Sequence, residues 1–203
     1  MKSSELLLEL IEEEKKLFKE NSASKILIGG MSQGCEVALA TLLRYKGKEP
    51  LGGVIGLSGI LGFDFENDSG QIKSMAQGTA LSDEQKSIIR RTPLFLYQGE
   101  DDNNCQIDVV EFSLRKIKEI HTKDGGKLDK SRYSFQTEAN MGHYMSDLEL
   151  KLLRKWIKKT MSKQLQREPS FSQCEQTTLI DDEMLMGAQV QNETSEKMKS
   201  LKG

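Results

Sequence analysis

Apolar and polar positions follow a helical period in five segments of the first 160 residues. In the first of them, leucines and isoleucines recur three and four positions apart between glutamates and lysines, which is typical of an amphipathic helix. The second is more apolar throughout and ends at Gly47, as expected of a buried helix. The predicted helices are residues 4–20, 33–46, 82–91, 109–120 and 147–160.

Short apolar runs that end in glycine or other small residues predict strands at residues 25–28, 52–59, 94–97 and 133–137. Strands without alternation, separated by helices, favour a parallel sheet that is buried on both faces. The sequence therefore predicts an α/β fold, with a mostly parallel sheet of about four strands and helices on both faces. Residues 60–78 show no clear period and are predicted to form a surface excursion or lid.

The regular pattern stops at Met161. Polar residues dominate from there to the end, so we predict an α/β domain over residues 1–160 and a disordered polar tail over residues 161–203. A brief helix near residues 182–186 is the one regular element expected in the tail. Such a tail accounts for a polar average: 30% of the 203 residues are charged, and the mean hydropathy is -0.53.

Composition excludes several classes of protein. The net charge is -2 and both signs are mixed throughout, which is unlike the basic footprint of a nucleic-acid-binding protein. Two histidines and three cysteines at unrelated spacings offer no metal site, and we expect neither metal nor cofactor. The apolar run near the N-terminus is broken at Glu9, too short for a signal peptide or a membrane span. We therefore expect a reducing, cytoplasmic setting.

Side chains that can act as a nucleophile, an acid or a base follow three of the predicted strands. Ser32 lies in a Gly-x-Ser-x-Gly segment after the first strand, Asp101 and Asp102 follow the third, and His143 follows the fourth. The carboxyl ends of parallel strands meet at one edge of a sheet, where ligands bind. The order serine, acid, histidine is the one found in α/β-hydrolases.

These residue types suit acyl transfer. A serine hydroxyl needs an imidazole to take its proton, and the imidazole needs a carboxylate to fix its tautomer and stabilise its cation. We expect the backbone N–H of Gln33 to stabilise the oxyanion. Gly30 and Gly34 are expected to be required because side chains at both positions would collide with the crossing strand and helix.

Each residue also has a simpler interpretation. Ser32 could belong to a structural glycine turn, His143 could simply start the last helix, and the two aspartates could be a solvated turn. His121 is interpreted as a surface residue near a helix C-terminus, favoured by the helix dipole. Catalysis is favoured only because all three residue types occur together, at three strand ends and in the order serine, acid, histidine.

Four segments resemble the phospholipase/carboxylesterase family of α/β-hydrolases, which includes the acyl-protein thioesterases. They are GGMSQGC, VIGLSGIL, TPLFLYQGEDD and MGHYMSDLELKLLRKWI. The resemblance implies a catalytic triad of Ser32, Asp102 and His143, with Asp101 as the second choice for the acid. It also implies hydrolysis of esters or thioesters without a cofactor. The substrate would be an acylated protein, a lysophospholipid or a small ester.

The chain departs from this family in several places. Family members begin with further strands and a His-Gly-x-Gly-type loop that supplies a second oxyanion donor, and the present sequence contains neither. Losing one such donor costs about 10²- to 10³-fold in turnover. Cys35 and Gln98 stand where the family usually has glycine and histidine, and Asn103-Asn104-Cys105 replaces a proline-containing segment after the acid.

Two functions therefore remain open from the sequence. The first is a serine hydrolase of the carboxylesterase or acyl-protein thioesterase type, acting through an acyl-Ser32 intermediate. The second is a catalytically impaired remnant of such a hydrolase, acting as a binding module or representing an incomplete gene product. An exposed sheet edge would favour self-association in either case.

Overall fold

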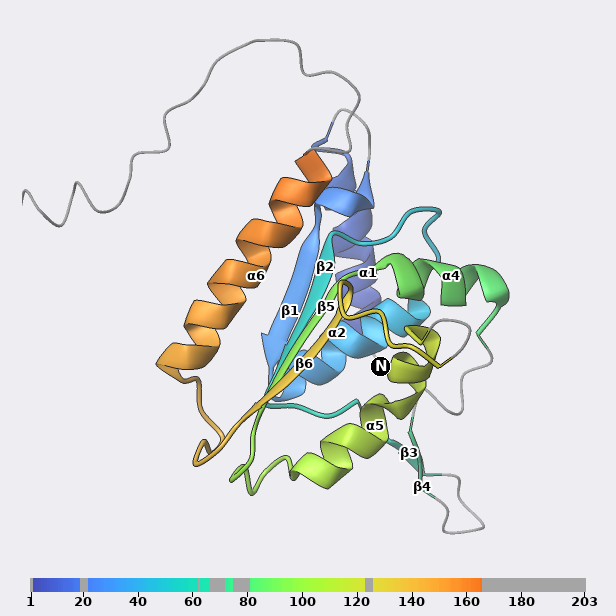
Figure 1. The fold of residues 1–203 in the computed structure, drawn as a ribbon. Coiled ribbons are helices and arrows are strands. Elements are labelled where there is room, and N and C mark those ends of the chain that lie inside the picture. The colour runs from blue at the N-terminus through green and yellow to red at the C-terminus, as the bar shows by residue number, and fades with distance from the viewer. Residues whose placement is uncertain are drawn as a thin grey trace, which may run out of the picture. The chain divides into compact units, whose positions relative to one another are not determined.

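A four-stranded parallel sheet lies at the centre of the described part of the chain. The computed structural model describes residues 2–18, 22–61, 63–65, 72–74, 81–122 and 126–165. The sheet order is β1 (Leu27–Met31), β2 (Gly53–Leu57), β5 (Leu94–Gly99) and β6 (Tyr133–Glu138), and every pairing is parallel. Figure 1 shows the four arrows side by side and pointing the same way. The predicted α/β class is confirmed.

Helices cover both faces of the sheet (Figure 1). On one face lie α1 (Lys2–Lys15), α2 (Gln33–Arg44), α4 (Asp83–Arg91) and α5 (Ile107–Ile120), and on the other lies α6 (Asp147–Leu165). A 3₁₀ turn, η1 (Ala23–Lys25), precedes β1. Along β5, Leu94 and Leu96 pack toward the four helices, while Phe95 and Tyr97 pack with Trp156 of α6. Burial on both faces explains why this strand is a continuous apolar run.

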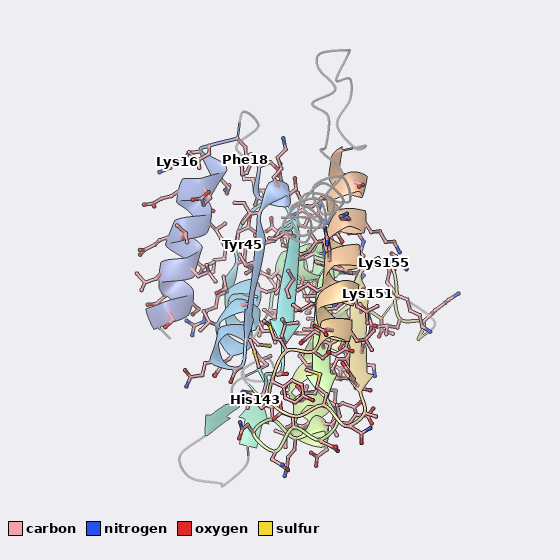
Figure 2. All side chains as sticks on the ribbon, turned by 90° about the vertical axis from the view of Figure 1, so that its left-hand side faces the viewer. Lys16, Phe18, Tyr45, His143, Lys151 and Lys155 are labelled. Atoms are coloured by element: carbon pink, nitrogen blue, oxygen red, sulfur yellow. The ribbon has the colours of Figure 1, made fainter. Side chains whose placement is uncertain are left out.

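The helix α6 presents a charged side to solvent. Lys151 and Lys155, labelled on α6 in Figure 2, are both exposed. Among the described residues, no helix has the length and apolarity needed to cross a bilayer. Since α6 reaches Leu165, the first five residues of the predicted tail are helical, in keeping with the good helix formers there. Residues 166–203 lie outside the described residues, and their disorder and brief helix stay predictions.

The segment predicted as a lid contains a pair of strands that the sequence did not reveal. β3 (Phe63–Phe65) pairs antiparallel with β4 (Ile72–Ser74). Each strand has only three residues, too few to display a period. The remainder of residues 62–80 lies outside the described residues, so a role as a lid stays a prediction.

The first strand and the first helix have other bounds than predicted. β1 is Leu27–Met31 and includes both glycines, whereas the prediction was residues 25–28. α1 ends at Lys15, and Leu17, expected on its apolar stripe, is 76% exposed. β1 forms one edge of the sheet, because within the described residues it pairs only with β2. The self-association expected from an unpaired sheet edge stays a prediction.

The prediction that His121 lies on the surface is wrong. Its side chain is fully buried, with Nδ1 2.9 Å from the carbonyl oxygen of Ile117 and Nε2 3.3 Å from that of Thr92. The ring also packs on Tyr133, with 5.5 Å between centroids. The chain after α5 folds back here, and Asp129 donates its N–H to the carbonyl of His121. This tertiary contact covers a position that the helix pattern alone leaves open.

Burial lowers the pKa of His121 below its ordinary value of 6.5, and it outweighs the two carbonyl contacts that favour the cation. The folded protein therefore binds a proton here less readily than the unfolded chain. The resulting stability is present above about pH 6.5 and is lost as the pH falls through the folded pKa. We expect the His121 ring to titrate below pH 6.5 in an NMR titration of the two histidines. A midpoint at or above 6.5 would contradict this assignment.

Candidate active site

Ser32 occupies the turn between β1 and α2 in a conformation that few side chains adopt. Its φ is 56° and its ψ is -119°, outside the regions open to most residues. The Ser32 N–H donates to the carbonyl of Leu57 at 2.9 Å, and the Ser32 carbonyl accepts from the N–H of Cys35 at 3.0 Å. These bonds hold the strained turn between the two elements, as expected when strain persists at a functional site.

The two glycines beside this turn have different roles. A Cβ on Gly30 would lie 2.4 Å from the backbone carbon of Gly34, so residue 30 cannot carry a side chain without moving the backbone. A Cβ on Gly34 would meet no atom within 4 Å. The predicted collision is therefore wrong for Gly34, because its missing Cβ points into open space rather than toward the strand.

Asp102 is the buried acid of the site. It is 2% exposed, and its Oδ1 accepts the backbone N–H groups of Asn104 and Cys105, both at 2.9 Å. Its Oδ2 accepts from Gln98 at 3.0 Å and lies 2.8 Å from Nδ1 of His143. Burial by itself raises the pKa of Asp102, but the bonds from these four donors outweigh it and lower the pKa from its ordinary value. The carboxylate is therefore held in its charged form.

His143 joins the acid to the serine. Its Nδ1 lies 2.8 Å from Oδ2 of Asp102, and its Nε2 lies 3.0 Å from Oγ of Ser32. Figure 2 shows His143 in the lower part of the view, at the end of the sheet where the strands stop. The side chain of Asp101 is exposed, and its backbone N–H donates to the carbonyl of Met141. The structure therefore brings Ser32, His143 and Asp102 into one hydrogen-bonded chain that Asp101 does not join.

The first N–H groups of α2 lie next to Ser32. Gln33 is the first residue of this helix, and within the described residues its N–H has no hydrogen-bond acceptor. A helix N-terminus also carries partial positive charge. Both features suit the expected role of Gln33 in holding an oxyanion, which stays a prediction.

Gln98 is a partner of the acid that sequence reasoning did not assign. Gln98 is fully buried, and its Nε2 donates to Asp102 at 3.0 Å and to the carbonyl of Cys105 at 2.8 Å. Its place on β5, four residues before Asp102, was the available signal. The segment 103–105 supplies the two N–H donors to Oδ1.

The cysteines near the site do not offer a second nucleophile. Burial raises the pKa of Cys35 to about 12, and the nearby Cys105 and Glu36 add to the effect. A protonated, buried thiol is inert. The thiol of Cys35 packs into space left by Gly56 and Gly59, where a Cβ would meet it at 2.7 Å and 3.0 Å. Cys35 therefore acts as a small core residue.

A metal centre is a weaker explanation of the same side chains. Possible ligand atoms of Asp102, Cys105 and His143 lie within 4.8 Å of one another. However, both Asp102 oxygens already accept hydrogen bonds. Burial and the charge of Asp102 also raise the pKa of Cys105, whereas a metal binds the thiolate. The donor set suits a triad better than an ion.

Comparisons with known proteins find a matching family model and several relatives. The model of a family described as phospholipase/carboxylesterase matches residues 1–161. Acyl-protein thioesterase 1 of Aspergillus fumigatus is 30% identical over 144 residues, which cover 68% of this chain and 48% of the relative. Acyl-protein thioesterase 1 homolog 1 of Dictyostelium discoideum is 30% identical over 141 residues, covering 70% and 51%. The chain thus spans about half the length of these curated relatives.

Solved structures show the same fold. Arabidopsis thaliana SOBER1 superposes with a TM-score of 0.56 at 25% identity, covering 78% of this chain and 62% of that chain. Zea mays acyl-protein thioesterase 2 gives a TM-score of 0.56 at 18% identity, covering 78% and 64%. At this identity, the second likeness concerns the fold alone.

Proposed function

Because the chain belongs to the phospholipase/carboxylesterase family, we propose that it is a serine hydrolase that cleaves carboxylic esters or thioesters. The observation that carries the proposal is the hydrogen-bonded chain from Ser32 through His143 to Asp102. The spacing of 3.0 Å between Oγ and Nε2 lies within reach for proton transfer. The buried, charged carboxylate suits the stabilisation of an imidazolium.

Each residue of the site has a role in the proposed reaction. His143 takes the proton of Ser32 as its Oγ attacks the acyl carbon, and the N–H of Gln33 stabilises the oxyanion. His143 then protonates the leaving thiol or alcohol. A water activated by His143 hydrolyses the acyl-Ser32 ester and releases the carboxylic acid.

The proposed substrate is an acylated protein carrying a thioester, since two relatives bear the name acyl-protein thioesterase. A lysophospholipid or a small ester is the alternative within the same chemistry. The proposal includes self-association through the unpaired side of β1, which sedimentation equilibrium would detect. It also includes a cytoplasmic location, in keeping with the free thiols of Cys35 and Cys105, which imaging of the tagged chain would test.

A fluorophosphonate probe should label the purified full chain, and Ser32→Ala or His143→Ala should abolish labelling. The probe requires an activated serine. Ser58→Ala is the matched control, because Ser58 also follows a strand with positive φ but is fully buried, and its Oγ has no partner in the described residues. We expect this variant to be labelled as strongly as the wild type.

Absence of labelling in the folded wild-type protein would favour the second candidate function, a catalytically impaired remnant that binds acyl ligands. The observation behind this alternative is that the chain spans only about half the length of its curated relatives. Turnover of short acyl thioesters, measured beside labelling, separates a slow enzyme from an inactive one.

A further inference from the structure

Hydrogen bonds hold the loop that carries His143 at both of its ends. It runs from the end of β6 at Glu138 to the start of α6 at Asp147. Near its beginning, Met141 is fully buried, and its carbonyl accepts the N–H of Asp101 at 3.0 Å, next to the acid of the triad. Gly99 permits this approach, since a Cβ there would lie 2.2 Å from the Met141 carbonyl oxygen.

The far end of the loop is tied by Ser146. Its Oγ donates to Oε2 of Glu138 at 2.5 Å, and the same oxygen accepts the hydroxyl of Tyr97 at 2.9 Å. A serine hydroxyl has one proton, so it accepts its second bond, from the N–H of Glu149 at 3.0 Å. Ser146 therefore connects β6 with the first turn of α6 across the His143 loop.

Glu149 completes this arrangement. The N–H of Ser146 donates back to Oε2 of Glu149 at 3.3 Å, which forms a reciprocal capping box at the start of α6. Glu149 is fully buried, and in the described residues its Oε1 has no partner. Burial raises the pKa of Glu149, and the nearby charge of Glu138 adds to the effect. Burying a carboxyl that has an unpartnered oxygen costs free energy, so a role in capping the helix does not by itself explain this residue.

We propose that Glu138, Tyr97 and Ser146 form a positioning clamp that holds His143 in register between Ser32 and Asp102. The clamp touches no reacting atom and acts only through the loop, which is short enough to transmit a shift at Ser146 to the imidazole three residues earlier. The proposal deepens the proposed hydrolase function and rests on it. Misplacing a catalytic group by about 1 Å can cost about 10²-fold in rate.

The two histidines of the chain make the clamp testable by NMR of the full protein labelled with ¹⁵N-histidine. The Nδ1 proton of His143, bonded to Asp102, should give a downfield signal, and the buried ring of His121 serves as an internal reporter of the fold. In Ser146→Ala we expect the His143 signal to broaden or vanish while that of His121 stays. Fluorophosphonate labelling should slow by about 10- to 100-fold.

Three variants complete the experiment. Ser146→Thr keeps the hydroxyl and should restore both the signal and labelling. Ser162→Ala removes a hydroxyl that donates to the carbonyl of Lys158 within α6, and this variant should change neither the signal nor labelling. If Ser146→Ala does not fold, Tyr97→Phe removes the other donor to Glu138 and should show a weaker form of the same effect.

The possible results separate the clamp from the hydrolase function. A sharp His143 signal with labelling within twofold of wild type in Ser146→Ala would overturn the clamp. So would the joint loss of both histidine signals in Ser146→Ala and Tyr97→Phe, which would indicate a general structural role. If wild type is not labelled yet its His143 signal depends on Ser146, the clamp stands and the proposed hydrolase function fails.

Discussion

Replacing Asp102 by asparagine is expected to slow acylation of Ser32 by about 10⁴-fold, the loss typical of a triad whose histidine takes the wrong tautomer. The Oδ2 oxygen, 2.8 Å from Nδ1 of His143, requires that nitrogen to carry the proton. An asparagine amide in the same place can offer an N–H instead and leave Nε2 unable to accept the serine proton. The rate of fluorophosphonate labelling, followed over time, measures the effect.

Asp101→Asn is the matched control and should change the labelling rate by less than about twofold. Its side chain is exposed, and its one described bond, from the backbone N–H to Met141, survives the substitution. In Asp102→Asn the side-chain oxygen can still accept from Asn104 and Cys105, so the loop should keep its shape. A large loss in Asp101→Asn with little change in Asp102→Asn would reverse the assignment of the acid.

The sequence predicted the main elements of the fold because their signals are local. Apolar runs such as the one in β5 and the amphipathic period of α6 need only neighbouring residues to be recognised. The placement of Ser32, Asp102 and His143 at strand ends then follows from the topology of a parallel sheet. Nothing in the pattern distinguishes Asp101 from Asp102; the resemblance to the family favoured Asp102, and the structure shows which of the two is buried.

Features that depend on long-range contacts could not be read from the sequence. His121 looks like a surface residue at the end of its helix, but contacts with the carbonyl of Thr92, the ring of Tyr133 and the returning chain at Asp129 bury it. Gln98 looks like a polar interruption of a strand, and its meaning depends on the fold of the loop around Asp102. The link between Ser146 and Glu138 likewise spans a loop whose shape no local pattern specifies.

Gly30→Ala is expected to lower the free energy of unfolding by about 1–3 kcal/mol or more, because the new Cβ meets backbone that cannot step aside as a flexible side chain would. The three nearest atoms all belong to the backbone of Gly34, at 2.4, 2.6 and 2.7 Å. For a domain of this size the loss corresponds to roughly 3–10 °C in Tm. Thermal unfolding followed by circular dichroism measures it.

Gly34→Ala tests the other residue in the close approach between Gly30 and Gly34. A Cβ at residue 34 meets nothing within 4 Å, and alanine is favoured over glycine inside a helix by about 1 kcal/mol. The Tm of this variant should stay the same or rise by a few degrees. Equal losses of Tm in both variants would mean that the turn at Ser32 needs both glycines, as the Gly-x-Ser-x-Gly motif alone suggests. A loss confined to Gly30→Ala would show that the close approach of strand and helix depends on the missing side chain of residue 30. The labelling rate of that variant would then show whether Ser32 keeps its reactivity.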